Sequence, residues 1–428
     1  MNILMMTNTY KPIVGGIEKS IEEFSSHYRA KGHNVLIVAP VFKNAPSNEP
    51  GVFSIPAIQN FNGSDFSVEL PAPGILNQVL DKFNPDIVHS HHPFLVGDTA
   101  LRVSADYNIP IVFTYHTRYE MNTHYVPGNS DMLKRFVVNL ASGYSNLCNR
   151  VIAPSQSIEK ILKERGVRTH IETIPTGIDA GEFQQGNGKS LRESLNIPNK
   201  AFLVGCIGRL AEEKNMLFLT DAVSGFLEKN KDAHFLIVGE GDLQTEIREI
   251  VEKRNLKQRV HFAGTLKGAE KINAYHAMDI FVFASKSETQ GLVLAEAMAA
   301  GVPVIGLDSP GVRDIIKDNV NGYLLHDNDI IKYIEAIQRF YRLDKDKKDY
   351  LIRQAKSTAN DYDYGKSIKK TLAVYEKAIG EKAASKDKDK NILSDIKRSI
   401  KQELDIITNL LKSAKTALDA GNIQDEKK

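Results

Sequence analysis

A glycine turn at the start of a predicted helix is the strongest chemical signal in the chain. Gly291 comes shortly after the apolar run 280–284, and an Ala-rich helical pattern begins at Leu292. This order predicts a strand, a turn and a helix whose N-terminus lies at the C-terminal edge of a sheet, where open α/β folds bind ligands. The backbone N–H groups of Gly291, Leu292 and Val293 would suit a diphosphate, because a helix N-terminus carries positive partial charge.

Two glutamates belong to the same segment. Glu288 precedes the turn, and Glu296 lies within the predicted helix. Carboxylates accept hydrogen bonds, so Glu288 could bind sugar hydroxyls and Glu296 a ribose. Two glutamates at this spacing alone would indicate only solvated surface charge. Their position between a buried strand and a second apolar run favours a binding site instead.

Two cations follow another apolar run. Arg209 and Lys214 come directly after the run 202–207, so they are predicted at the same sheet edge as the glycine turn. Two fixed cations there could neutralise a nucleotide diphosphate and stabilise the charge that grows on it when a glycosidic bond breaks. Pairing with Glu212 or Glu213 is the structural alternative, and the sequence leaves it open.

A glycine pair follows the first apolar run of the chain. Gly15 and Gly16 come after the run 3–6 and before a helical pattern. Glycines let the backbone approach a ligand closely, and the helix would present its N-terminus there. The pair is not the spaced-glycine dinucleotide fingerprint, and the sequence has no GxxxxGK[ST] motif, so dehydrogenase and nucleotide-hydrolase functions are disfavoured.

His116 follows the apolar run 111–115 and could orient a hydroxyl acceptor or help to stabilise a reacting sugar. Simple packing at a strand end is the competing interpretation. Three further histidines follow the neighbouring run, and we interpret them as lining a cleft, because the matching carboxylate or cysteine set of a zinc site is missing. These histidines are His89, His91 and His92. No metal ligand is therefore predicted.

The apolar runs that precede these residues form two series. Short continuous runs that alternate with helical patterns are typical of parallel strands covered on both faces. The first series is 3–6, 35–39, 87–89, 111–115 and 151–153, and the second is 202–207, 235–238, 260–263, 280–284 and 302–305. The predicted fold class is α/β, with two Rossmann-like, doubly wound parallel-sheet domains in tandem.

A Pro- and Gly-containing segment at 174–179 separates the two series and predicts a hinge. We therefore predict one domain at 1–177 and a second at 178–358. Residues 359–380 are predicted to form a helix. Residues 381–428 are predicted to form an appendix, a charged linker followed by an amphipathic helix.

The appendix carries one apolar stripe at three- and four-residue steps. Its members are Leu393, Ile396, Ile400, Leu404, Ile407, Leu411, Ala414 and Leu418. A single apolar stripe requires a single surface to cover it. Docking on the same protein or pairing in a homo-oligomer is therefore favoured over contact with an anionic membrane.

Composition narrows the function classes. The chain has 428 residues, 55 basic and 53 acidic side chains, and a net charge of +2. Nothing in this balance indicates nucleic-acid binding, and no apolar run approaches the roughly 20 residues that span a bilayer. The two cysteines are predicted to be buried thiols, and the first residues do not resemble a signal peptide. We expect a cytoplasmic protein, with peripheral contact at the inner face of the cell membrane left open.

Taken together, these motifs resemble the retaining nucleotide-sugar glycosyltransferases of family 4, which have the GT-B fold. The resemblance covers about residues 1–380. It implies that the first domain binds the acceptor and the second binds the donor across a shared cleft. It also implies that the helix 359–380 returns to the first domain. By this resemblance, Glu288 and Glu296 contact the donor hexose and ribose, Arg209 and Lys214 contact the diphosphate, and Gly16 lies near the phosphates. It implies no required cofactor beyond the sugar nucleotide.

Within the family, the segment 114–125 is similar to that of the bacterial diacylglycerol glucosyltransferases, and 287–291 agrees. This similarity implies transfer of a hexose, such as glucose from UDP-glucose, to a lipid hydroxyl. It also implies acceptor contacts at His116, Tyr119 and His124, with His116 in the catalytic position. The alternatives are a soluble sugar or phosphoinositol-type acceptor, and a non-catalytic protein that binds nucleotide sugars. The sequence leaves open the donor nucleotide, the hexose, the linkage, the number of sugars added and the oligomeric state.

Overall fold

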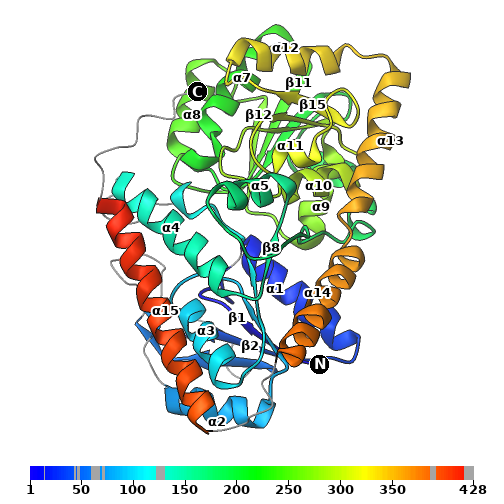
Figure 1. The fold of residues 1–428 in the computed structure, drawn as a ribbon. Helices are drawn as coiled ribbons and strands as arrows, with labels where there is room; N and C mark the ends of the chain where they lie inside the picture. Colours follow the sequence, from blue (N-terminus) through cyan, green and yellow to red (C-terminus); the bar gives the residue numbers. More distant parts are fainter. Residues whose placement is uncertain are drawn as a thin grey trace. The chain divides into compact units, whose positions relative to one another are not determined.

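The computed structural model describes residues 1–13, 15–42, 45, 49–58, 68–69, 73–121, 131–385 and 392–418. The chain forms two compact units (Figure 1). Unit 1 comprises residues 1–154, 158–174 and 368–428, and unit 2 comprises residues 155–157 and 175–367. The chain passes from the first sheet to the second at Ile174 and Pro175, within the segment predicted as a hinge.

Unit 1 is built on a parallel seven-stranded sheet of order β3-β2-β1-β6-β7-β8-β9. The strands are β1 (Asn2–Met6), β2 (Asn34–Pro40), β3 (Val52–Ile55), β6 (Ile87–Ser90), β7 (Ile111–Thr114), β8 (Arg150–Ala153) and β9 (Ile171–Thr173), with a separate pair β4 (Ala57–Ile58) and β5 (Val68–Glu69). The helices are α1 (Gly16–Ala30), α2 (Pro73–Phe83), α3 (Val96–Asp106), α4 (Asp131–Leu147), α5 (Gln156–Glu164) and, from the end of the chain, most of α14 (Tyr364–Ala384) and α15 (Ile392–Leu418). The strand order reverses between β1 and β6, which is the position where such sheets bind ligands.

Unit 2 has a parallel six-stranded sheet of order β12-β11-β10-β13-β14-β15. Its strands are β10 (Phe202–Ile207), β11 (Ala233–Val238), β12 (Val260–Gly264), β13 (Ile280–Phe283), β14 (Val304–Leu307) and β15 (Gly322–Leu325). Its helices are α6 (Gly188–Ser194), α7 (Met216–Lys229), α8 (Gln244–Lys253), α9 (Gly268–Ala277), α10 (Leu292–Ala299), α11 (Val312–Ile315), α12 (Ile330–Tyr341) and α13 (Lys345–Asp361). The order reverses between β10 and β13.

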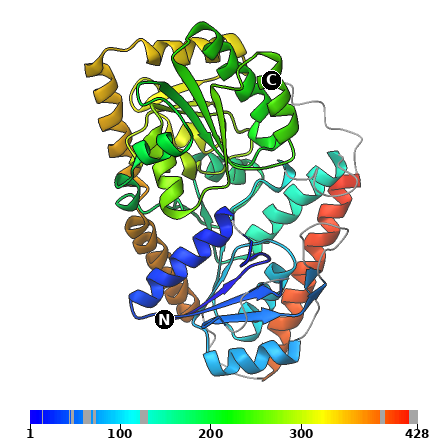
Figure 2. The same ribbon diagram turned by 180° about the vertical axis from the view of Figure 1, so that it is seen from behind.

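Both sheets are covered by helices on their two faces, as Figures 1 and 2 show for each unit. In unit 2 the two faces of the sheet pack into separate apolar clusters, one against α10 and one against α7 and α12. Strands buried on both faces are apolar throughout, which is why the two predicted series are confirmed. The sequence missed three edge strands, β3, β9 and β15, because they are short and partly exposed.

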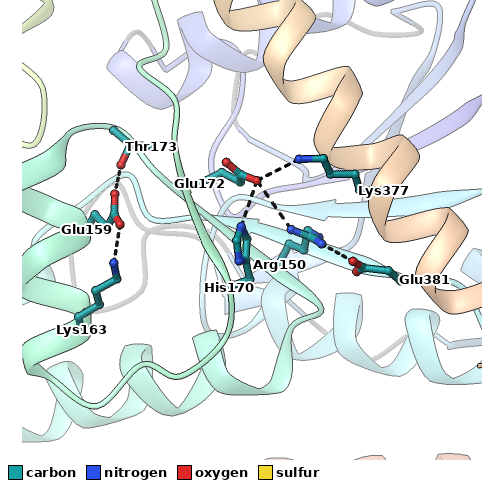
Figure 3. Close-up of polar contacts among 8 residues, drawn as sticks. All are labelled: Arg150, Glu159, Lys163, His170, Glu172, Thr173, Lys377 and Glu381. Atoms are coloured by element: carbon teal, nitrogen blue, oxygen red, sulfur yellow. Dashed lines mark hydrogen bonds and ion pairs between the residues drawn. The ribbon is translucent and has the colours of Figure 1, made fainter.

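A cluster of charged side chains joins β8, β9 and α14 within unit 1 (Figure 3). Arg150 of β8 pairs with Glu172 of β9 at 3.8 Å and with Glu381 of α14, and Lys377 of α14 pairs with Glu172 at 3.5 Å. These partners hold the end of α14 against the sheet. The helix therefore continues to Ala384, and the prediction of a linker was wrong for its first four residues, because the sequence does not show the partner of Glu381.

Candidate functional site

The loops that follow β10 and β13 lie side by side at the carboxyl edge of the unit 2 sheet. These strands are neighbours, with Val204 opposite Ile280. The backbone carbonyl of Glu213 accepts a hydrogen bond from the N–H of Lys286 at 3.0 Å and from the hydroxyl of Ser285 at 3.3 Å. The two motifs that the sequence places 74 residues apart therefore form one surface at the reversal of strand order.

Lys214 and Glu288 contact each other directly on this surface. The Nζ atom of Lys214 lies 2.5 Å from Oε1 of Glu288, and the two side chains are 25% and 15% exposed. Each charge is thus balanced by its neighbour while both side chains keep an accessible edge. A polar ligand at this edge could bind the ammonium and the carboxylate together.

Arg209 lies on the same loop and pairs with Glu213. The Nη2 atom of Arg209 is 3.1 Å from Oε1 of Glu213, whose side chain is 4% exposed. This is one of the two pairings that the sequence left open. The side chain of Arg209 is nevertheless 54% exposed, so the pair positions the guanidinium from one side and leaves an accessible cationic face.

The N-terminus of α10 belongs to the same sequence motif as Glu288. Gly291 caps the helix with a φ of +66°, a left-handed conformation that favours glycine. Gln290 fixes the turn, because its side chain accepts from the N–H of Thr176 at 2.7 Å and donates to the hydroxyl of Thr176 at 2.8 Å. Leu292 and Val293 are half-buried in the first turn, where N–H groups have no carbonyl of the preceding turn to bind. The predicted strand, turn and helix are confirmed.

Glu296 is buried within α10, with 3% of its surface exposed. Its Oε2 atom accepts a hydrogen bond from the hydroxyl of Tyr275 at 2.7 Å and lies 2.5 Å from Nζ of Lys271. Sequence reasoning missed both partners. They are one helical turn apart on α9, so the i, i+4 spacing of a cation and a tyrosine was the available signal. A buried carboxylate held by two donors is rigid, as a binding group for hydroxyls must be.

In unit 1, four histidines gather at the carboxyl ends of β6 and β7. Nδ1 of His91 lies 2.9 Å from Nε2 of His116, and their rings stack with centroids 5.2 Å apart. The ring of His89 packs against that of His91 in a tilted arrangement, with centroids 4.1 Å apart, and its Nε2 atom lies 2.7 Å from the hydroxyl of Thr114. Nδ1 of His92 accepts from the backbone N–H of Asn8 at 3.1 Å. His116 is therefore the outermost, partly accessible member of a packed cluster.

Burial keeps these imidazoles neutral at pH 7. Desolvation lowers the pKa of His89 and His92 to about 3 and that of His116 to about 4, and it lowers the pKa of His91 well below the usual value. A neutral His116 can donate or accept one hydrogen bond at a hydroxyl. Its low pKa makes it a weak base, so positioning is the role that the geometry favours.

The remaining predicted residues of unit 1 have differing surroundings. Gly15 caps α1 and is exposed together with Gly16, and a Cβ atom added at Gly16 would meet no atom within 4 Å. Tyr119 lies in a short 3-10 helix and packs edge-on against Phe94 and Tyr115, with ring centroids 5.2 and 5.9 Å away. His124 lies outside the described residues. The ligand contacts predicted for these residues stay predictions.

The described part of the chain has neither a metal-binding cluster nor a membrane-spanning helix. No group of three or more histidine, cysteine or acidic side chains in it is arranged to hold a metal ion. Among the helices described, none combines the length and the apolar character that crossing a bilayer requires.

Two protein-family models match the chain in succession. Residues 14–182 match the model described as "Glycosyltransferase Family 4", and residues 188–358 match "Glycosyl transferases group 1". The first match covers most of unit 1 and its glycine pair and histidines. The second covers the loops after β10 and β13.

Relatives and solved structures agree with these matches. The chain is 29% identical over 359 residues to alpha-monoglucosyldiacylglycerol synthase of Acholeplasma laidlawii, covering 79% of this chain and 88% of that protein. It is 28% identical over 332 residues to the enzyme of the same name from Streptococcus pneumoniae, covering 76% and 75%. The crystal structure of Anabaena HepE with UDP superposes with a TM-score of 0.67 at 20% identity, covering 88% of this chain and all of HepE, which shows a common fold.

Proposed function

The chain is a glycosyltransferase of family 4 with the GT-B fold, and we propose that it transfers a hexose from a sugar nucleotide to a lipid hydroxyl with retention of anomeric configuration. The proposed donor is UDP-glucose and the proposed acceptor is a diacylglycerol at the cytosolic membrane surface. The proposal includes no further cofactor, because Arg209, Lys214 and the N-terminus of α10 would neutralise the charge of the leaving diphosphate.

The observation that carries the proposal is the pairing of Lys214 with Glu288 beside Arg209 and the start of α10. When the bond between the anomeric carbon and the phosphate oxygen breaks, negative charge grows on the diphosphate. Arg209, Lys214 and the positive end of α10 would stabilise that charge. Glu288 would accept hydrogen bonds from hexose hydroxyls, and Glu296, held by Tyr275 and Lys271, would accept them from the ribose.

The acceptor side of the reaction is assigned to His116. A neutral imidazole can orient the acceptor hydroxyl without bringing a charge into the site. The hydroxyl oxygen then bonds to the anomeric carbon on the face from which the diphosphate leaves. The departing phosphate oxygen takes the hydroxyl proton, so no protein carboxylate has to act as a covalent nucleophile.

The names of the relatives support the choice of acceptor and sugar. Two relatives at 28% and 29% identity are named for glucosyl transfer to diacylglycerol, and a solved structure of the same fold contains UDP. A lipid hydroxyl is the acceptor class that best joins these names with the site described above.

The proposed substrates can be tested by mass analysis of products. The purified protein is incubated with UDP-glucose, UDP-galactose or GDP-mannose, each in the presence of diacylglycerol, phosphatidylinositol or a soluble sugar. We expect a monohexosyl diacylglycerol from UDP-glucose, with an α-anomeric proton coupling by NMR. Product confined to soluble sugars or phosphatidylinositol would refute the acceptor, and a β-linked product would refute retention.

The site assignment is tested by Glu288→Gln and Lys214→Ala. Each should lower turnover by about a hundredfold or more, because a charge that acts on the reacting donor is lost. The matched controls are Glu249→Gln and Lys253→Ala, which alter an exposed pair 3.5 Å apart on α8. All four variants should keep the wild-type circular dichroism spectrum. Wild-type turnover in the first two would remove the assignment.

A further inference from the structure

The C-terminal helix α15 docks on unit 1 through its polar face. It lies along α3 and α4 in both views (Figures 1 and 2). Glu403 accepts from the guanidinium of Arg102 on α3 at 2.5 Å. Arg398 donates to the backbone carbonyl of Ala105 at 2.6 Å, and the hydroxyl of Ser399 donates to a side chain of α3 at 2.6 Å. Hydrogen bonds and an ion pair therefore hold the first half of the helix.

The second half of α15 approaches α4 closely. Asn409 donates to the backbone carbonyl of Leu140 at 3.1 Å. A Cβ atom added at Gly143 would lie 1.7 Å from Oδ1 of Asn409, so any larger residue at that position of α4 would displace the Asn409 side chain. Ser413 and Ala417 are 1% and 4% exposed against the same surface. The contact is tight enough to fix which face of α15 points outward.

The outward face is the apolar stripe. The sequence predicted that this stripe would dock the helix on its own protein or pair it in a homo-oligomer. The helix does dock on its own protein, but the prediction that the stripe makes this contact was wrong. The exposed fractions are 49% for Ile396, 55% for Ile400, 58% for Leu404, 49% for Ile407, 48% for Leu410, 63% for Leu411 and 69% for Leu418. At 100° per residue, these side chains cover an arc of about 120° along the whole helix. A continuous exposed strip of this kind marks an interaction surface.

One edge of the stripe is lined with cations. Lys397, Lys401, Lys412 and Lys415 are all exposed and occupy the next arc of about 60°. Asp395 and Asp405 lie outside the arc of the stripe, whereas Glu403 lies within it, between Leu410 and Ile396, and is paired with Arg102 of α3. Asp395 pairs with Arg398 at 2.6 Å, and the half-buried Asp405 lies beyond the row of lysines.

We propose that the outward face of α15 binds the surface of an anionic lipid bilayer. Leucine and isoleucine side chains would enter the boundary between headgroups and acyl chains, and the lysines would contact anionic headgroups beside them. An apolar stripe bordered by lysines is the pattern that suits a helix lying in the plane of a membrane interface. The docked polar face presents the stripe ready-formed, so binding need not fold the helix first.

A second copy of the chain is the competing occupant, and the lysines disfavour its antiparallel pairing. If two copies paired antiparallel through their stripes about a two-fold axis, both rows of lysines would lie along the same side of the contact. Like charges would then repel across the interface. An anionic bilayer instead attracts both the cations and the apolar side chains.

The proposed membrane-binding surface lies on α15 alone, but the role of membrane binding in catalysis rests on the proposed function. A diacylglycerol acceptor stays in the bilayer, so an enzyme held at that surface meets the acceptor at high local concentration. Vesicle cosedimentation separates the two proposals, because it measures binding to vesicles without donor or acceptor turnover.

Vesicle cosedimentation tests the proposal with the full chain. Vesicles of phosphatidylglycerol mixed with phosphatidylcholine are compared with vesicles of pure phosphatidylcholine. We expect binding to the anionic vesicles that weakens with added salt. Leu404→Ser combined with Leu411→Ser should lower the partition coefficient at least about tenfold, because two large apolar side chains leave the interface. Ile331→Ser, which alters a side chain 68% exposed on α12, is the matched control and should bind like the wild type.

The role of the lysines is tested with equal changes of net charge. Replacing Lys397, Lys401, Lys412 and Lys415 by glutamine should lower anionic binding at least about tenfold. The control replaces four exposed lysines away from α15, namely Lys200, Lys229, Lys345 and Lys369, and should bind like the wild type. Equal weakening in both quadruple variants would overturn the proposal, since net charge alone would then explain binding.

Two further measurements complete the test. If the leucine variant binds vesicles normally but turns a wild-type dimer into a monomer in sedimentation velocity, the stripe binds a second copy and the bilayer proposal is overturned. All α15 variants should transfer sugar normally to a short-chain, detergent-dispersed acceptor, which confirms that they are folded. Glu288→Gln should bind vesicles normally, so failure of the proposed reaction would leave this proposal standing.

Discussion

Acidification should destabilise unit 1 through two buried histidines, one in β6 and one just after it. His89 and His92 are 2% and 6% exposed, and burial lowers the pKa of each from 6.5 to about 3. Below pH 6.5 the unfolded chain binds protons that the folded chain does not accept. The folded state is therefore fully stable above pH 6.5 and loses stability as the pH falls toward 3.

The size of the effect follows from the two pKa values. Between pH 7 and pH 5 each histidine should remove about 2 kcal/mol from the free energy of unfolding, because one pKa unit corresponds to about 1.4 kcal/mol. The two together should remove about 4 kcal/mol. The double variant His89→Asn, His92→Asn keeps an acceptor near the position of Nδ1, which faces Tyr375 in one case and Asn8 in the other. It cannot titrate.

Hydrogen exchange of the amides in β1, β6 and β7 reports this change, once intrinsic exchange rates are taken into account. In the wild type the largest protection factors should fall by at least a factor of about a thousand on going from pH 7 to pH 5, because the pKa values of His91 and His116 are lowered in the same direction. The double variant should be less stable at pH 7 but should lose about a thousandfold less protection over the same interval. If both proteins lost protection equally, these histidines would not be the groups that titrate.

Three substitutions test single contacts. Tyr275→Phe removes one donor from Glu296 and should raise the KM for the sugar nucleotide roughly three- to tenfold with little change in kcat, measured by initial rates. Gly291→Ala places a Cβ atom at a φ of +66° and should cost about 1 kcal/mol, measured by chemical denaturation of unit 2. Gly143→Ala should displace the Asn409 side chain and weaken the contact of α15 with α4, measured as faster tryptic cleavage at the helix lysines, and adding Asn409→Ala should restore part of the protection because the clashing side chain is gone.

The sequence by itself determined the two sheets and the local form of the donor site. Strands buried on both faces must be apolar at every position, so β1 and β10 are visible as continuous runs. The turn at Gly291 was equally visible, because a glycine between a strand and a helix satisfies a local backbone requirement. These features depend on neighbours in the chain, which the sequence shows directly.

The partners of charged residues were decided only by the tertiary structure. Lys214 pairs with Glu288, and Lys271 reaches the buried Glu296. Each pair joins different elements, and a charged side chain in a sequence can pair with any opposite charge that folding brings near. Lys214 and Glu288 pair because β10 and β13, the strands that they follow, are neighbours in the sheet.

The orientation of α15 shows the same limit. Periodicity determined that Ile400, Leu404 and Leu411 share one face of a helix, and the structure confirms the helix. It could not determine which face docks. The polar face of α15 finds hydrogen-bond and ion-pair partners on α3 and α4, as Glu403 does with Arg102. Satisfying those polar groups stabilises the docked helix with its apolar face turned outward, and only the three-dimensional arrangement of the partner surface could decide that.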